Sequence, residues 1–265
     1  MSKVESRVTT YQILYGSVKV DLQVQDRGQG QPFLLFHGGA GPISVASFAS
    51  LLADRKHVRV ITPTHPGFSN TVRPDELKTM AGLAQIYAAL LDQLGVNDVT
   101  VIGNSMGGWV AAELALLSSP RVSKIILVDA VGIEVPNHPI ADVSKLTPDE
   151  LMALSYHDPK PFRIDPASLT DQQRAIMRAN RATLQVYGGP QSFDPTLRDR
   201  LARISTPTLV IWGDSDRVVD PEYGRAFAAA IPGAKFELLK DTGHVSQIET
   251  PELLLEAIPT VSECK

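Results

Sequence analysis

Short apolar runs alternate with segments of helical pattern along most of this chain, and this alternation constrains the fold more than any other feature. The run Pro32-Phe33-Leu34-Leu35-Phe36 is apolar throughout, as expected of a strand that is covered on both faces. A helix-like segment at 45–53 follows it, and the same order recurs toward the end of the chain. Strands that alternate with helices form a mostly parallel sheet with helices on both faces. We therefore expect an α/β fold with a doubly wound sheet.

The pattern predicts where these strands and helices lie. Two strand-like runs open the chain on either side of Gly16 and predict a β-hairpin. The expected strands are 8–15, 17–25, 32–36, 58–62, 99–102, 124–128, 208–212 and 235–239. The expected helices are 45–53, 80–94, 106–117, 223–230 and 251–257.

The alternation stops between residues 132 and 205, where the sequence is richer in proline and polar residues and has no strand pattern. A helix is expected at 151–156, and the capping-box sequence Thr170-Asp171-Gln172-Gln173 predicts the start of another that runs to about Tyr187. A long segment without strands at a sheet edge is more often a lid than an irregular loop. We therefore predict a helical lid at 132–205 and a core domain made of 1–131 and 206–265.

Length and composition exclude several classes of protein. The 265 residues are enough for one large domain, and the net charge of −4 argues against a nucleic-acid partner. No apolar run approaches the roughly 18 residues that span a bilayer, and the segment from Met1 to Tyr15 lacks a secretory pattern. We expect a cytoplasmic protein without a membrane partner. The one cysteine, Cys264, excludes an internal disulfide, and no zinc-binding cluster or phosphate loop is present, so no metal or cofactor is expected.

The segment Gly103-Asn104-Ser105-Met106-Gly107 carries the strongest chemical signal. It lies between the apolar run 99–102 and a helix-like segment. A serine on a sharp turn between a strand and a helix is the arrangement of a nucleophile elbow, and the flanking glycines let the two backbone segments come close. We expect Ser105 to be a nucleophile.

A serine nucleophile needs a base, and the base needs a carboxylate that orients it. His244 follows the strand expected at 235–239, and Asp216 follows the strand expected at 208–212, so both belong at the same sheet edge as Ser105. The chain order is Ser, Asp, His. Asp129, which follows the strand at 124–128, is an alternative acid.

The reaction also needs backbone N–H groups that stabilise an oxyanion. We expect one from Met106, at the start of the helix after the elbow. The other should come from the loop His37-Gly38-Gly39-Ala40-Gly41, where small residues allow the backbone to approach a substrate, and we favour Gly39.

Together these motifs resemble those of the α/β-hydrolase superfamily over essentially the whole chain. His37-Gly38-Gly39 is similar to the family's oxyanion loop, Gly103–Gly107 to its elbow, Trp212-Gly213-Asp214-Ser215-Asp216 to its acid segment and Gly243-His244 to its base segment. The resemblance implies a mostly parallel eight-stranded sheet flanked by helices, with the helical lid inserted after the sixth strand.

The elbow Gly-Asn-Ser-Met-Gly-Gly is similar to that of the meta-cleavage-product hydrolases, which cut carbon–carbon bonds in vinylogous diketones. The sequence departs from that branch in two places. Val245 stands where those enzymes usually carry tryptophan. Their oxyanion loop usually reads Gly-Gly-Gly-Pro-Gly or close to it, whereas here Ala40 and Gly41 precede Pro42. A serine at 105 disfavours the branches that use an aspartate nucleophile.

Substrate contacts are expected from the catalytic loops and from the lid. Arg174, Arg178 and Arg181 share one face of the expected lid helix, either as a solvated stripe or as binders of a substrate carboxylate. The expected contacts are Gly38, Ala40, Asn104, Tyr156, Met177, Arg178 and Val245.

These expectations describe a cofactor-independent serine hydrolase that acts on a small, partly apolar carboxylic ester or lactone. A carbon–carbon bond hydrolase using the same residues is the first alternative. A ligand-binding receptor on the same fold is the second, because some plant hormone receptors resemble α/β-hydrolases and keep a triad.

Overall fold

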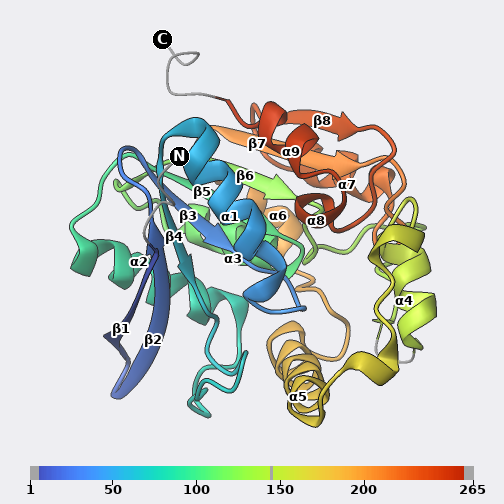
Figure 1. Ribbon diagram of the computed structural model, residues 1–265. Helices are drawn as coiled ribbons and strands as arrows, with labels where there is room; N and C mark the ends of the chain where they lie inside the picture. The colour runs from blue at the N-terminus through green and yellow to red at the C-terminus, as the bar shows by residue number, and fades with distance from the viewer. Residues whose placement is uncertain (1–5, 144–145, 260–265) are drawn as a thin grey trace.

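A twisted central sheet organises the molecule (Figure 1). The computed structural model describes residues 6–143 and 146–259, and within these ranges eight strands form one sheet in the order β1-β2-β4-β3-β5-β6-β7-β8. The strands are β1 (Ser6–Tyr15), β2 (Val18–Arg27), β3 (Pro32–Phe36), β4 (Arg59–Pro63), β5 (Val99–Asn104), β6 (Val122–Val128), β7 (Thr208–Gly213) and β8 (Lys235–Leu239). The β1–β2 and β2–β4 pairs are antiparallel, and all other pairs are parallel. The predicted fold class is confirmed.

Helices cover both faces of this sheet. Successive side chains of a strand point to opposite faces, so an apolar strand contributes to a core on each side. Val101 of β5 packs into one core cluster and Ile102 into the other. The first cluster includes residues of α2 (Met80–Leu94), α3 (Met106–Leu116) and α7 (Pro221–Ala229). The second includes residues of α1 (Ile43–Lys56) and α9 (Pro251–Ala257), and the short α8 (Ser246–Glu249) lies between β8 and α9 in the chain.

The segment between β6 and β7 is helical in the part that the structure describes. It contains α4 (Pro148–Ser155), the short helices η2 (Lys160–Phe162) and η3 (Pro166–Ser168), α5 (Asp171–Gly188) and α6 (Leu197–Leu201). We call residues 132–205 the insert. Thr170 and Gln173 form the capping box that the sequence predicts, with Thr170 Oγ1 accepting from the Gln173 N–H at 3.2 Å. Figure 1 places α4 beside the ends toward which β6, β7 and β8 point.

An ion pair joins α6, near the end of the insert, to α3 of the core. Arg200 of α6 donates two hydrogen bonds to the carboxylate of Glu113 on α3, at 2.7 and 2.8 Å. Glu113 is buried, so this bidentate pair satisfies a carboxylate that would otherwise be costly to hold inside the protein.

The described residues contain neither a candidate membrane span nor a candidate metal-binding cluster. None of their helices combines the length and the apolar character needed to cross a bilayer. No group of three His, Cys, Asp or Glu residues is placed to bind a metal ion in residues 6–143 or 146–259. Cys264 and the first five residues of the N-terminal segment lie outside the described residues.

Candidate active site

Ser105 occupies a sharp turn between β5 and α3. Its backbone has φ 55° and ψ −121°, a strained conformation for a residue other than glycine. Two glycines allow the turn. A Cβ at Gly103 would lie 2.1 Å from the carbonyl oxygen of Gly107, and a Cβ at Gly107 would lie 2.7 Å from that of Phe36. The strand, the turn and the helix therefore lie closer together than any side chain at these two positions permits.

The imidazole of His244 bridges the serine and a carboxylate. Its Nε2 lies 2.9 Å from Ser105 Oγ, and its Nδ1 lies 2.8 Å from Oδ2 of Asp216. All three residues follow the carboxyl ends of strands β5, β7 and β8, so parallel strands bring residues far apart in sequence to one edge. With Nδ1–H donating to the carboxylate, Nε2 is free to accept the serine proton.

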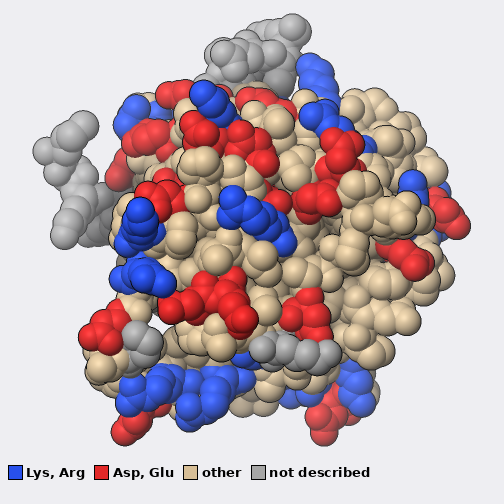
Figure 2. Space-filling model, turned by 90° about the vertical axis from the view of Figure 1, so that its right-hand side faces the viewer, with Lys and Arg blue, Asp and Glu red and all other residues tan. Residues whose placement is uncertain are grey.

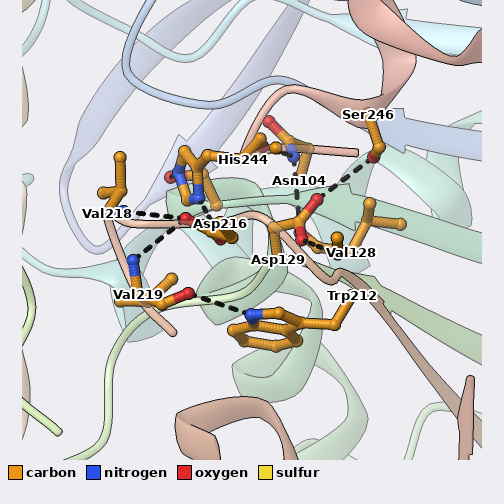
Figure 3. Close-up of polar contacts among 12 residues, drawn as sticks. Asn104, Val128, Asp129, Trp212, Asp216, Val218, Val219, His244 and Ser246 are labelled. Atoms are coloured by element: carbon orange, nitrogen blue, oxygen red, sulfur yellow. Dashed lines mark hydrogen bonds and ion pairs between the residues drawn. The ribbon is translucent and has the colours of Figure 1, made fainter. Parts of the chain in front are cut away.

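The Asp216 carboxylate is held in place by the backbone of its own loop. Its Oδ1 accepts hydrogen bonds from the N–H groups of Val218 at 2.8 Å and Val219 at 3.1 Å (Figure 3). The buried indole of Trp212 donates to the carbonyl of Val219 at 3.0 Å. These hydrogen bonds fix both the carboxylate and the loop that carries it, and they leave Oδ2 to contact His244.

His244 is buried, and burial alone would lower its pKa. The negative charge of Asp216 and the hydrogen bond to it outweigh that effect, so the pKa of His244 lies above its ordinary value. The carboxylate therefore stabilises the imidazolium that forms when the base takes a proton.

A second carboxyl group, that of Asp129, lies beside this pair at the end of β6 (Figure 3). Its Oδ1 accepts from the Gly213 N–H at 2.8 Å, and its Oδ2 accepts from the Ser246 hydroxyl at 3.1 Å. It is fully buried, and burial together with the negative charge of Asp216 raises its pKa well above the usual range. Asp129 thus links the loops of Asp216 and His244, whereas the hydrogen bond to the imidazole comes from Asp216.

Asn104, expected as a substrate contact, is buried and bonded inside the protein. Its Nδ2 donates to the carbonyl oxygens of Val128 and His244 at 3.4 and 3.3 Å, and its Oδ1 accepts from Gln247 at 3.3 Å. The amide is therefore not free to bind a substrate in this structure, and it holds the backbone of the base in place.

The loop after β3 forms a tight turn next to the nucleophile. The Gly41 N–H donates to the Gly38 carbonyl at 3.1 Å, which places Gly39 and Ala40 at the corners of a β-turn. A Cβ at Gly38 would lie 3.1 Å from the Cβ of Ser105, so the two backbones nearly touch. Within the described residues, the N–H groups of Gly39 and Met106 have no backbone acceptor. They are available as the two expected oxyanion donors.

Two buried histidines, His37 and His65, form a chain of hydrogen bonds that ends on the Gly38 carbonyl of this turn. His37 Nδ1 lies 2.7 Å from the Gly38 carbonyl, and its Nε2 accepts from the His65 N–H at 3.1 Å. His65 in turn contacts the hydroxyl of Tyr87 on α2. Burial lowers the pKa of His37 to about 4 and that of His65 well below its ordinary value. Both rings are therefore neutral near pH 7, as their hydrogen bonds require.

The insert meets the catalytic loops at two places. Near α4, the ring of Tyr156 stacks on Phe162 at 4.8 Å, and a Cβ at Gly243 would lie 2.7 Å from the Tyr156 Cα. Near α5, Leu184 approaches Gly39, where a Cβ would lie 2.7 Å from the leucine Cδ2. Tyr156 is half-buried beside the base loop.

The other expected substrate contacts lie at different depths in the structure. Val245 follows His244 directly and is half-buried. Ala40 and Gly38 belong to the turn beside Ser105. Met177 and Arg178 are exposed on α5. Arg181 donates to the carbonyls of Val143 and Leu146 within the insert. Substrate contact at all of these positions stays a prediction.

The carboxyl edge of the sheet faces the viewer in Figure 2. Lys and Arg side chains form a band along the lower rim of this face, at the height where Figure 1 places α5. The surface is hollowed between that band and the body of the molecule, and Asp and Glu side chains lie above the hollow. The rim of this hollow is therefore charged.

A family model described as the alpha/beta hydrolase family matches residues 33–257. The chain belongs to that family. Among its curated relatives, 2-hydroxymuconate semialdehyde hydrolase of Pseudomonas putida is 28% identical over 245 residues, and 2-hydroxy-6-oxo-6-phenylhexa-2,4-dienoate hydrolase of Burkholderia cepacia is 28% identical over 259 residues. Both alignments cover 86% of this chain and 86% of the relative.

Solved structures extend the comparison to another hydrolase. A thermophilic esterase from Thermogutta terrifontis superposes with a TM-score of 0.74 at 28% identity, over 94% of this alpha/beta hydrolase and 96% of the esterase. This chain is therefore similar both to hydrolases of dienoate substrates and to an esterase.

Two residues that organise the site were not expected from the sequence. Asn180 of α5 contacts the oxyanion loop, and Glu249 of α8 joins the base loop to the insert. The Glu249 carboxylate accepts from the N–H groups of Gly243 at 2.7 Å, His157 at 3.1 Å and Asp158 at 3.0 Å. For Asn180 the available signal was its helical spacing with Leu184 and Tyr187, which puts a polar side chain on the apolar face of the helix. Glu249 gave no such signal, because its partners lie in distant loops.

Proposed function

We propose that this alpha/beta hydrolase cleaves a small, partly apolar carboxylic ester or lactone through an acyl-enzyme. The observation that carries the proposal is the His244 imidazole, which lies within hydrogen-bonding distance of both Ser105 Oγ and Asp216. Together with the two backbone N–H donors of the oxyanion hole, these three side chains would supply the groups that acyl transfer requires. The insert would act as a lid, and the hollow above the band of Lys and Arg side chains would be the approach to the serine.

In the proposed reaction, His244 Nε2 takes the Ser105 proton as Oγ attacks the substrate carbonyl carbon. The electron pair of the carbonyl moves to oxygen, and the N–H groups of Gly39 and Met106 stabilise that oxyanion. The carbon–oxygen bond to the alcohol then breaks, and the imidazolium gives the alcohol its proton. Water repeats the sequence on the acyl-enzyme and releases the acid and free Ser105.

Carbon–carbon hydrolysis is the second candidate, and the similarity to the two Pseudomonas putida and Burkholderia cepacia hydrolases favours it. They act on hydroxy-oxo-dienoates or related semialdehydes. The relay described above would serve that reaction equally, and Arg178, exposed on α5, would be available to a substrate carboxylate. Val245, in the position after the base, is the departure that keeps this reaction second.

The test is turnover of p-nitrophenyl esters of increasing acyl length by the wild-type protein and by Ser105→Ala. We expect hydrolysis by the wild type with an optimum at short to medium chains, because the proposed substrate is small and partly apolar. We expect Ser105→Ala to lose several orders of magnitude in kcat with an unchanged melting temperature. Retained turnover by Ser105→Ala would remove the serine from the mechanism.

The same preparation should be offered a 2-hydroxy-6-oxo-dienoate, whose colour is lost on cleavage. Loss of colour dependent on Ser105, with poor ester turnover, would replace the ester proposal by carbon–carbon hydrolysis. A single slow turnover of either substrate, with a rearrangement of the insert, would favour a receptor instead.

A further inference from the structure

Three polar side chains on one face of α5 attach this helix to the loops around the nucleophile. The Thr183 hydroxyl donates to the Gly67 carbonyl at 2.9 Å, and the Tyr187 hydroxyl donates to the Pro66 carbonyl at 2.9 Å. Both of these bonds reach the loop after β4. The third side chain, Asn180, differs because it also reaches the loop after β3.

Asn180 bridges the two loops. Its Nδ2 donates to the Ala40 carbonyl at 3.2 Å, and its Oδ1 accepts from the Ser69 N–H at 2.9 Å. The side chain is 4% exposed, so neither bond is replaced by water. A Cβ at Gly41 would lie 2.6 Å from Asn180 Nδ2, so the amide is in close contact with the turn.

The bond to Ala40 fixes one particular peptide group. The carbonyl of that group accepts from Asn180, while its N–H, which belongs to Gly41, donates to Gly38 and closes the turn. The same Gly38 carbonyl is contacted by His37 from below. The turn is therefore held by contacts at Ala40 and at Gly38, and the N–H of Gly39, at its first corner, has no backbone acceptor in the described part of the chain.

We infer that Asn180 is a positioning residue for the oxyanion hole: by holding the peptide group between Ala40 and Gly41, it aims the Gly39 N–H at the developing oxyanion. The inference rests on the proposed function. It makes the insert part of the catalytic apparatus, because one of its helices orients a donor that belongs to the core. An oxyanion donor acts only when its geometry fits the transition state, and a displacement of about 1 Å can cost about 100-fold in rate.

The test compares Asn180→Leu and Asn180→Asp with the control Thr183→Val. The aspartate keeps an acceptor for the Ser69 N–H but has no donor for the Ala40 carbonyl. This variant therefore tests the hydrogen bond to Ala40. Thr183→Val removes another α5 hydrogen bond, which is 2.9 Å long and reaches Gly67 instead. We expect both Asn180 variants to lose about 10- to 100-fold in kcat with little change in KM, and the control to lose less than about threefold.

A trifluoromethyl ketone gives a readout that a purely structural role would not move. Ser105 Oγ adds to its carbonyl carbon, the serine proton passes to His244, and the carbonyl oxygen becomes an oxyanion in the hole. We expect its Ki to rise in the Asn180 variants by the same factor as kcat/KM falls, and to stay within about threefold in Thr183→Val. Should the leucine variant fold poorly, the aspartate variant carries the comparison.

Two negative results have different meanings. If the ketone inhibits the wild type and the Asn180 variants match Thr183→Val in kcat and Ki, the inference is wrong and the proposed function stands. If the ketone fails to inhibit the wild type and Ser105→Ala keeps its turnover, the proposed function is wrong, and the inference falls with it.

Discussion

At the scale of single residues, two carboxyl groups at neighbouring strand ends have different surroundings. Asp216 accepts two backbone N–H bonds on one oxygen and contacts His244 with the other. Asp129 bonds Gly213 and Ser246 and has a strongly raised pKa, caused first by burial and then by the charge of Asp216. Asp216 is therefore the partner of the imidazole, whereas Asp129 links the two loops in surroundings that disfavour its charged form.

This difference predicts opposite results for two similar substitutions. Asp216→Asn should lower kcat by about 10²–10⁴-fold, because an amide that donates to Nδ1 forces the tautomer in which Nε2 cannot accept the serine proton. Asp129→Asn should change kcat by less than about threefold, since an amide oxygen still accepts from Gly213 and the hydrogen bond to the imidazole stays with Asp216. Steady-state kinetics of both variants on one ester, with melting temperatures, checks this.

A reversal of these effects would identify Asp129 as the acid and contradict our assignment. Equal losses in both variants, accompanied by lower melting temperatures, would show that the two carboxyl groups act as one structural unit.

Ser105, His244 and Asp216 could be predicted from sequence because each follows a strand of a parallel sheet, and such strands end at a common edge. The role of Asn180 could not be predicted in this way. Its two partners, Ala40 and Ser69, lie 140 and 111 residues away along the chain. The contact depends on where α5 lies relative to the sheet. The periodicity of a sequence shows which face of a helix is buried, but it does not show where the helix packs.

At the scale of elements, most boundaries agree with the sequence prediction. Strands β3 and β8 and helices α2 and α9 have the predicted bounds. Their ends carry local signals, such as Thr79, whose side chain caps α2 by accepting from the Gly82 N–H. The four-residue helix α8 was missed because it is too short to show a period, and α6, with five residues, was missed for the same reason. The role of the insert as a lid stays a prediction.

The approach of α3 to β5 at the elbow gives a prediction about stability. Gly103→Ala would place a Cβ 2.1 Å from the Gly107 carbonyl oxygen, a backbone atom that can move only with the helix. We expect this variant to lose about 3 kcal/mol or more in free energy of unfolding, measured by urea titration. The control is Gly188→Ala at the end of α5, where a Cβ would meet only Ser192 Oγ, 4.0 Å away, outside the helix's own backbone.

Gly188→Ala should be neutral or slightly stabilising, because alanine is the better helix former. Equal stability of the two alanine variants would mean that the elbow relaxes without cost, and the tight strand–helix packing would then be no constraint on position 103.

At the scale of the whole molecule, the buried histidines predict loss of stability in acid. The pKa of His37 is about 4 in the folded protein, against about 6.5 in the unfolded chain. Between these values the unfolded state binds a proton that the folded state does not, so the free energy of unfolding falls as pH falls from about 6.5 to 4. Over this range His37 alone lowers the free energy of unfolding by about 3 kcal/mol. The pKa of His65 is also lowered by burial, so His65 acts in the same direction.

Other groups titrate in that window, so the measurement compares variants. His37→Gln should be less stable than the wild type at pH 7 and should show a shallower decline of the free energy of unfolding between pH 6.5 and 4. His57→Asn, at an exposed histidine in a left-handed position that asparagine tolerates, should decline like the wild type. Identical pH profiles for His37→Gln and the wild type would contradict the prediction.

The carboxylate of Glu249 limits how this enzyme can be re-engineered. One side chain on the core supplies acceptors to the backbone that precedes the base and to the backbone of residues 157 and 158 in the insert. Suppose that the insert were exchanged for that of another hydrolase, with junctions at the end of β6 and the start of β7. The Glu249 carboxylate would then lose the two N–H donors of residues 157 and 158. Transplants that retain the 157–158 segment keep the attachment, so the natural unit of exchange is smaller than the insert itself.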